Sequence, residues 1–272
     1  MGEQTAGPVI GVFDSGVGGL TVARAILRRA PAARLLYLGD TAHVPYGPRP
    51  LPQIRDFALQ IIDFLFSQGA DVVVMGCNMS AAAGAHEAAL TRFPQPVFAV
   101  VQPGSRAAAA RTRGCVGVIA TQGTVASGIY GRTLRGLGVA TVYEQACPAF
   151  VPLVERGLAE GPEVDAAVTE YLEPLRDAGI DTLIFGCTHY PYLRAPIARL
   201  LGAGVTLIDP GEYVAEEVAA HFAASAQAVA LDPRQHRFFS SGDPNSLRRE
   251  GERFLGLPLM HVAHVNVPLE VG

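Results

Sequence analysis

Short apolar runs alternate with amphipathic helical patterns along the first hundred residues. Strands are predicted at four apolar runs, namely residues 9–14, 34–41, 72–75 and 96–101. Helices are predicted between them, at residues 20–29, 50–68 and from about residue 80, with another alanine-rich helix after 102–105. Continuous apolar runs bounded by turn residues are typical of strands that are buried on both faces of a parallel sheet. The pattern therefore predicts an α/β unit.

The same order of elements recurs in the next hundred residues. Strands are predicted at 116–120, 139–144, 182–185 and 205–209, and helices at 151–155 and 164–178. Corresponding strands of the two stretches are offset by about 104 to 110 residues. A nearly constant offset indicates an ancient duplication. Two similar halves that each present strand ends would form a cleft between them.

The last sixty residues break this symmetry. They predict a helix from 213 to about 226, a strand at 237–241, a turn at 242–245, a helix from 246 and a final apolar segment at 260–267. We expect this tail to fold back on the first half. The prediction is an α/β protein of two pseudo-symmetric domains with mainly parallel sheets and the active site in the cleft between them. Residues 1–100 plus 212–272 would form one domain, and residues 101–211 the other.

Composition narrows the class of partner. The chain has 272 residues, its formal net charge is −4 and its pI is near 6.0, so no strongly basic surface is available for nucleic acid. The first residues lack a cationic stretch followed by an apolar core, and no run has the roughly 18 apolar residues of a membrane span. We expect a cytoplasmic protein that binds a small molecule and neither nucleic acid nor membrane.

Two of the four cysteines occupy equivalent positions in the repeated halves. Cys77 and Cys187 each follow an aspartate, four apolar or β-branched residues and a glycine. Each precedes polar residues, where a buried parallel strand would end. The remaining pair, Cys115 and Cys147, lies far away in sequence, and the absence of a Cys-x-x-Cys motif argues against a zinc site. The repeat therefore predicts two thiols at one cleft.

Thiols at strand-to-helix junctions suit acid–base chemistry. A helix N-terminus and loop amides can lower a thiol pKa from its usual value of about 8.5, and a thiolate in such a place can act as a base or as a nucleophile. Two thiols on opposite sides of a cleft can remove a proton from one face of a carbon and return it on the other, as in racemisation or epimerisation beside a carboxylate. A nucleophilic thiol hydrolase would leave the second cysteine unexplained.

Five ordered motifs carry a resemblance to a known family. They are residues 13–20, 39–47, 76–78, 146–148 and 186–191. Together they resemble the cofactor-independent glutamate racemases of the aspartate/glutamate racemase superfamily. The resemblance implies interconversion of L- and D-glutamate by two cysteine bases, with D-glutamate used for peptidoglycan. It also implies that no pyridoxal phosphate, metal or nucleotide takes part.

The same resemblance assigns roles to residues. It makes Cys77 the base for D-glutamate and Cys187 the base for L-glutamate. Asp14 would assist Cys77, and His189 and Glu155 would assist Cys187. Substrate contacts are implied at the loops that follow the strands, namely Asp14, Ser15, Tyr46, Gly47, Asn78, Thr121, Thr124, Thr188 and His189.

One position departs from the family pattern. Met79 stands where the family usually has threonine, so a hydroxyl expected at a substrate carboxylate is missing. The backbone amide of Met79 and the hydroxyl of Ser80 remain as candidate contacts. This departure leaves open a racemase for aspartate or another acidic amino acid.

Other interpretations remain open at this stage. A non-catalytic amino-acid-binding protein could keep the cleft, and a thiol hydrolase or decarboxylase would change the mass of its substrate. The backbone of Tyr46 and Gly47 could matter more than the phenol, and Cys147 could form part of the site wall. Helices rich in alanine could equally form a dimer face, so a homodimer is left open.

Overall fold

Two parallel sheets form the framework of the computed structural model, which describes residues 7–222 and 231–266. The first sheet has the order β10-β9-β2-β1-β3-β4, and the second β6-β5-β7-β8. All pairs of neighbouring strands are parallel. The predicted fold class is therefore confirmed, and the core order β2-β1-β3-β4 of the first sheet repeats as β6-β5-β7-β8 in the second.

The strand bounds agree closely with the apolar runs. The first sheet contains β1 (Val9–Asp14), β2 (Arg34–Gly39), β3 (Val72–Met75), β4 (Val97–Ala99), β9 (Arg237–Ser240) and β10 (Val262–His264). The second contains β5 (Cys115–Ala120), β6 (Thr141–Ala146), β7 (Thr182–Gly186) and β8 (Thr206–Ile208). Strand β1 lies between two neighbours and is almost completely buried, as a central parallel strand covered on both faces should be.

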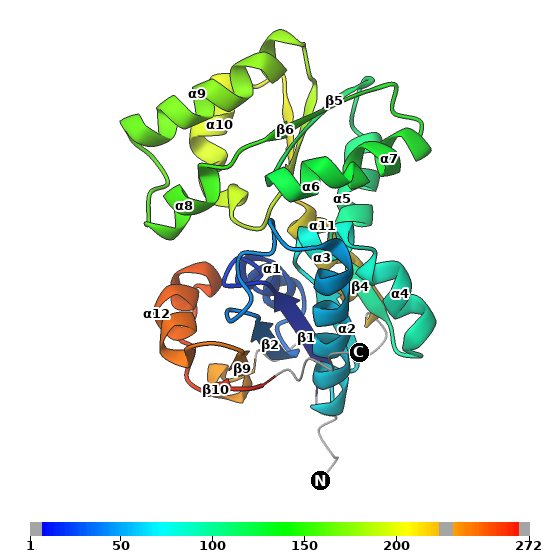
Figure 1. Ribbon diagram of the computed structural model, residues 1–272, viewed down its shortest axis with the longest axis vertical. Helices are drawn as coiled ribbons and strands as arrows, with labels where there is room; N and C mark the ends of the chain where they lie inside the picture. Colours follow the sequence, from blue (N-terminus) through cyan, green and yellow to red (C-terminus); the bar gives the residue numbers. More distant parts are fainter. Residues whose placement is uncertain (1–6, 223–230, 267–272) are drawn as a thin grey trace.

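Helices cover both sheets (Figure 1). We call the six-stranded sheet with α1 (Leu20–Arg29), α2 (Leu51–Ser67), α3 (Asn78–Ala82), α4 (Ala85–Arg92) and α12 (Pro244–Leu255) the first lobe. The second lobe is the four-stranded sheet with α6 (Gln122–Ser127), α7 (Ile129–Gly136), α8 (Phe150–Glu155), α9 (Pro162–Asp177), the 3₁₀ helix η1 (Tyr190–Leu193) and α10 (Arg194–Leu201). Helices α5 (Val101–Ala109) and α11 (Pro210–His221) pack against each other between the sheets.

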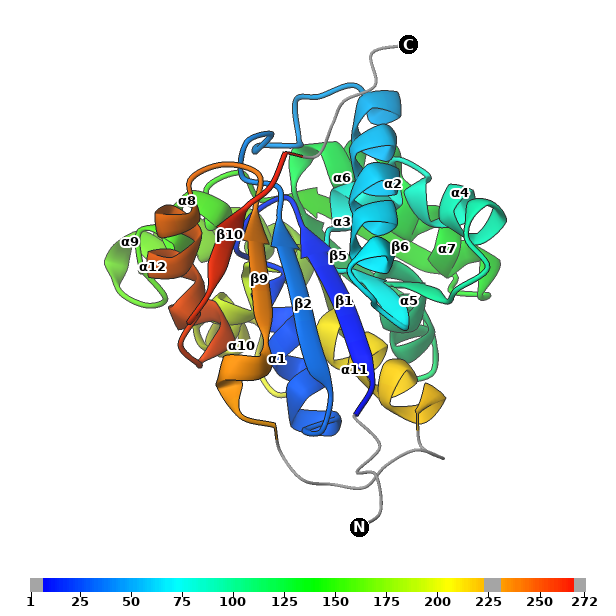
Figure 2. The same cartoon turned by 90° about the horizontal axis from the view of Figure 1, so that it is seen from below.

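The C-terminal segment extends the first sheet (Figure 2). A short 3₁₀ helix, η3 (Pro233–Gln235), precedes β9, which pairs with β2, and β10 pairs with β9. The tail thus lies on the first lobe, although the predicted domain boundaries themselves stay a prediction. Part of the predicted helix at 213–226 and the end of the segment at 260–267 lie outside the described residues.

Several helix boundaries differ from the predicted ones for local reasons. The alanine-rich helix begins at Asn78 and is divided into α3 and α4 at Gly84, which adopts φ of +74°. Helix α5 begins at Val101, so the fourth strand is shorter than predicted. Helices α11 and α12 begin two to three residues early because Asp209 and Asp243 cap them ahead of a proline.

The repeated aspartate in each half braces the neighbouring strand. Asp71 accepts a 2.8 Å hydrogen bond from the N–H of Val9 at the start of β1. Asp181 accepts a 2.9 Å bond from the N–H of Arg113, just before β5. Each carboxylate therefore fixes the register at the start of a central strand, and the carboxyl ends of the same strands meet at the cleft. In the described part of the chain, no helix has both the length and the apolar character needed to cross a membrane.

Candidate active site

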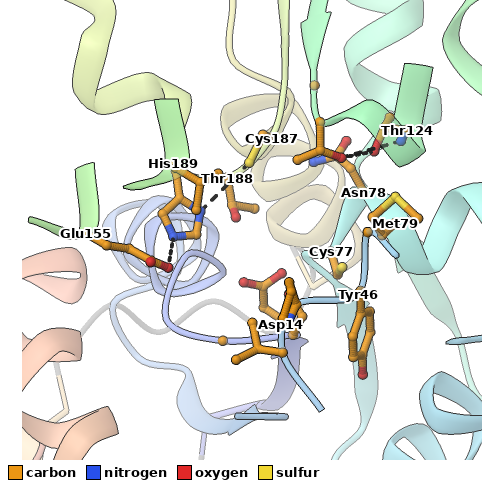
Figure 3. Close-up of a pocket in the computed structure, with 18 residues that line it drawn as sticks. Asp14, Tyr46, Cys77, Asn78, Met79, Thr124, Glu155, Cys187, Thr188 and His189 are labelled. Carbon is orange, nitrogen blue, oxygen red and sulfur yellow. Dashed lines mark hydrogen bonds and ion pairs between the residues drawn. The ribbon is translucent and has the colours of Figure 1, made fainter. Parts of the chain in front are cut away.

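A cavity of about 110 Å³ lies between the lobes, at the carboxyl ends of the strands. Its size suits a small molecule. Thirteen residues that the sequence nominated line it, namely Asp14, Ser15, Tyr46, Gly47, Cys77, Asn78, Met79, Thr121, Thr124, Glu155, Cys187, Thr188 and His189. Five further lining residues were not nominated, namely Gly16, Val44, Pro45, Val151 and Gly186. Cys77 and Cys187 both point into the cavity, from the first and the second lobe respectively (Figure 3).

Cys77 sits between the end of β3 and the first turn of α3, close to Asp14 at the end of β1. Burial, followed by the negative charge of Asp14, raises the pKa of the Cys77 thiol to about 12. The side chain and N–H of Ser80 and the N–H of Ser15 oppose this rise. Helix α3 has only five residues, and its field does not outweigh desolvation and the nearby carboxylate, so the pKa of Cys77 is raised and not lowered.

Asp14 is held by the loop that follows it. Its Oδ2 atom accepts a 2.9 Å hydrogen bond from the N–H of Gly19, one residue before α1 begins. A Cβ at Gly19 would lie only 2.5 Å from Cβ of Asp14, so glycine is needed for this close approach. The glycine-rich loop thus orients a carboxylate toward the Cys77 side of the cavity (Figure 3).

Cys187 has a different set of neighbours. Its Sγ atom lies 3.8 Å from Nδ1 of His189, and Nε2 of His189 lies 3.3 Å from Oε1 of Glu155 (Figure 3). Burial lowers the pKa of His189, but its contacts with Cys187 and Glu155 outweigh burial and raise that pKa to about 10. The imidazole therefore has one nitrogen beside the thiol and the other beside a carboxylate. The three residues form a chain from the α8 carboxylate to the thiol.

Polar groups from both lobes complete the wall. Thr121 caps α6, and its hydroxyl lies 3.0 Å from the hydroxyl of Thr124. Asn78 receives a 2.7 Å hydrogen bond at Oδ1 from the hydroxyl of Tyr130, on α7. Tyr130 was not nominated from the sequence, because a tyrosine inside a helix has no local feature that indicates such a partner.

The Tyr46 phenol points away from the two thiols (Figure 3). It donates a 2.5 Å hydrogen bond to Oδ2 of Asp40, whose Oδ1 accepts a 2.5 Å bond from the hydroxyl of Ser241. Nδ1 of His43 lies 2.7 Å from the same Oδ1. Asp40 therefore ties the loop at 43–47 to the end of β9, which leaves the backbone of Tyr46 and Gly47 at the cavity.

Met79 reaches across the cleft toward the second lobe. A Cβ at Gly123, on α6, would lie 2.8 Å from Sδ of Met79 and 3.1 Å from the carbonyl oxygen of Gly47. The thioether therefore fills the space that a larger residue at 123 would need. Ser80 is completely buried and does not line the cavity, so it supplies no hydroxyl in place of the missing one.

The other two cysteines, Cys115 and Cys147, do not line the cavity. Cys147 is completely buried outside the cavity, its Sγ atom lies 3.7 Å from the carbonyl oxygen of Gln145, and burial raises its pKa. Cys147 therefore belongs to the core and not to the wall of the cavity. Sγ of Cys115 lies 3.9 Å from the carbonyl oxygen of Ala178. Within residues 7–222 and 231–266, no group of three histidine, cysteine or acidic side chains has the arrangement of a metal site.

Comparison of the sequence with known families and proteins identifies racemases as relatives. The family described as Asp/Glu/Hydantoin racemase matches residues 4–218. The glutamate racemase of Parafrankia sp. (strain EAN1pec) is 45% identical to this chain over 254 residues, which is 92% of each protein.

Solved structures with a similar fold belong to the same kind of protein. The glutamate racemase of Thermus thermophilus, in complex with beta-chloro-D-alanine, is 42% identical, with a TM-score of 0.84 over 96% of this chain and 97% of that one. The glutamate racemase of Francisella tularensis subsp. tularensis SCHU S4, in complex with D-glutamate, is 30% identical, with a TM-score of 0.87 over 96% of this chain and 98% of that one.

Proposed function

Because this chain belongs to the Asp/Glu/hydantoin racemase family, we propose that it interconverts L- and D-glutamate by passing the Cα proton between Cys77 and Cys187. One observation carries the proposal: the two equivalent cysteines of the duplicated halves face a single small cavity from opposite lobes. The substrate can lose its Cα proton to one cysteine as the thiolate, and the planar intermediate that results can gain a proton from the thiol of the other cysteine on the opposite face. This is what inversion at a carbon requires.

The two thiols have different neighbours. The raised pKa of Cys77 keeps it as a thiol, which is a proton donor. On the other side, His189 lies between Sγ of Cys187 and the carboxylate of Glu155, so it can relay a proton to and from the Cys187 thiol. In the direction from L-glutamate, Cys187 removes the Cα proton, and Cys77 donates its proton to the opposite face. In the reverse direction Cys77 must first lose its proton, and the Asp14 carboxylate is the nearby acceptor.

The polar wall fits an amino dicarboxylate. Removing the Cα proton moves negative charge onto the α-carboxylate, and hydrogen-bond donors stabilise that charge. The amide of Asn78, the hydroxyl groups of Thr121, Thr124 and Thr188, and the loop N–H groups supply such donors. Asp14 and Glu155 can attract the ammonium group. We also propose, by similarity to the bacterial relatives, that the D-glutamate product serves peptidoglycan synthesis.

Isotope exchange in deuterated water tests the proposal. Purified protein without added cofactor should convert L-glutamate to the racemate while deuterium enters Cα, as seen by loss of optical rotation and by NMR. L-Aspartate in parallel tests the alternative substrate. A folded protein that exchanges the Cα proton of neither acid would reject the racemase assignment. A change in substrate mass beyond deuterium would indicate a hydrolase or decarboxylase.

Two matched variants separate the roles of the thiols. Cys77→Ser and Cys187→Ser should each slow racemisation by about a thousandfold, because each removes one acid–base group. Cys187→Ser should still exchange the Cα proton of D-glutamate, since Cys77 remains on that face. Cys77→Ser should exchange only L-glutamate. If both variants keep full activity, the two-thiol mechanism is wrong, and if ligand binding persists while the wild type never turns over, the protein is a binding protein.

A further inference from the structure

The last turn of α12 touches the second lobe beside the cavity. Figure 1 shows α12 directly below α8, with one helix in each lobe. Two adjacent residues of that turn, Arg253 and Phe254, contact the elements that carry Glu155 and His189. Neither Arg253 nor Phe254 lines the cavity.

Arg253 holds the C-terminal end of α8. Its Nη2 atom donates hydrogen bonds to the carbonyl oxygens of Val154, at 2.7 Å, and Glu155, at 3.4 Å. Carbonyl groups in the last turn of a helix lack partners within the helix, and a cation there is favourable. Gly157 has φ of +84°, and a Cβ at that residue would lie 2.8 Å from Nη1 of Arg253. The backbone that carries Glu155 is thus tied to the first lobe.

Phe254 supports the imidazole of His189. Its fully buried ring packs edge to face with His189, with 5.5 Å between centroids, and with Tyr192 at 4.9 Å. The hydroxyl of Tyr192 donates a 3.0 Å hydrogen bond to the carbonyl oxygen of Arg253, which also holds η1 to α12. The Phe254 ring on one side restricts how the imidazole can turn. In the orientation that remains, one nitrogen faces Cys187 and the other faces Glu155.

We infer that Arg253 and Phe254 are positioning residues for the Cys187 side of the reaction. Arg253 places the carboxylate of Glu155 through the backbone of α8, and Phe254 places the ring of His189. Because both belong to the first lobe, the alignment of this pair depends on how the lobes are closed. The inference rests on the proposed function, in which Cys187 is one of the two bases.

Isotope effects distinguish this role from simple loss of folded protein. Two enantiomers have the same free energy, so kcat/KM must stay equal in the two directions for every variant. What a positioning residue changes is which proton transfer limits the rate. If the Cys187 step becomes limiting, the deuterium isotope effect must grow for Cα-deuterated L-glutamate, whose deuteron Cys187 removes. It must shrink for Cα-deuterated D-glutamate, whose deuteron is removed by Cys77 in a step that no longer limits.

Arg253→Met keeps the length of the side chain and removes its hydrogen bonds. We expect kcat/KM to fall about tenfold in both directions, since a small misplacement of a catalytic group has an effect of this size. The isotope effects should separate as described. Arg253→Lys, which keeps a charged donor, should recover most of the activity. Arg248→Met is the matched control, because Arg248 lies on α12 with its side chain 61% exposed, and it should behave as the wild type.

Three results would overturn the inference. The first is an unchanged kcat/KM in Arg253→Met. The second is a lower rate with unchanged isotope effects, since that pattern reports fewer active molecules. The third is the same change in Arg248→Met. Should Arg253→Met fail to fold, Phe254→Leu tests the same isotope pattern through His189. A wild type without racemase activity would reject the proposed function itself, whereas a two-thiol racemase with symmetrical isotope effects in both variants rejects only this inference.

Discussion

The hydroxyl of Tyr130 donates a 2.7 Å hydrogen bond to Oδ1 of Asn78, and this bond joins the two lobes next to the cavity that Asn78 lines. Asn78 follows Cys77 in the sequence, whereas Tyr130 lies on α7 of the second lobe. Because Oδ1 is occupied as an acceptor, the amide nitrogen of Asn78 is the group left to donate into the cavity. Tyr130 therefore orients an amide without lining the cavity itself.

Removing this hydroxyl should weaken substrate binding. In Tyr130→Phe, Asn78 loses its partner, and we expect KM for glutamate to rise about fivefold, which corresponds to about 1 kcal/mol for one hydrogen bond. Steady-state kinetics in both directions measure the change. Tyr143→Phe is the control, since Tyr143 is 42% exposed on β6 and lies outside the cavity. An unchanged KM in Tyr130→Phe would show that the bond does not orient Asn78.

Gly18 allows the two lobes to meet beside Cys187. A Cβ at this position would lie 2.2 Å from Oγ1 of Thr188 and 2.7 Å from Nδ1 of His189. Gly18→Ala must push both side chains away, so we expect more than a tenfold loss of kcat/KM, with about 1–3 kcal/mol lost in the free energy of unfolding. Urea denaturation and kinetics measure the two effects. Gly204→Ala, where a Cβ would meet no atom within 4 Å, should change neither.

Met79 presents a thioether where a hydroxyl could hold a carboxylate. A thioether is only a weak acceptor, whereas threonine can donate a hydrogen bond. Met79→Thr should therefore lower KM for glutamate severalfold, by about 1 kcal/mol or less. Met79→Val has the shape of threonine without the hydroxyl and should not lower KM. If the two variants behave alike, the space that Met79 occupies matters and the missing hydroxyl does not. The ratio of glutamate to aspartate turnover in each variant measures the effect on specificity.

Burial of Cys77 should make stability depend on alkaline pH. The thiol pKa is about 12 in the folded protein and 9.0 in the unfolded chain. Below pH 9 the neutral thiol is present in both states, and its contribution to stability is complete. As pH rises toward 12 only the unfolded chain loses the proton, so stability falls by about 1.4 kcal/mol per pH unit.

Cys77→Ser cannot titrate in this range and should lack this part of the fall. Urea denaturation at about pH 9 and pH 11 measures the difference between the wild type and the variant. The gap between the two should change by more than 2 kcal/mol, at about 1.4 kcal/mol per pH unit. A gap that stays constant with pH would mean that Cys77 ionises as easily in the folded protein as in the unfolded chain.

Local pattern was sufficient for much of the framework. The apolar runs predicted β1 and β3 with their observed bounds, and the run into Gly186 predicted β7. Helix starts were less accurate, because a capping aspartate ahead of a proline, as at Asp209 and Asp243, begins a helix before its apolar face does. Tyr130 and Asp40 were missed for a different reason. Tyr130 binds Asn78, 52 residues away, and Asp40 binds Ser241, 201 residues away, and no spacing rule brings such pairs together.

From the order of residues alone, two thiols could be placed at one cleft, because parallel strands bring their carboxyl ends to the same edge of a sheet and the chain repeats one strand pattern twice. The protonation of those thiols could not be read in this way. It depends on burial and on neighbouring charge, which for Cys77 combine to raise the pKa and for Cys187 bring His189 alongside. The contact of α12 with α8 and His189 likewise arises only when the chain folds back, since desolvation and packing across lobes depend on three-dimensional neighbours.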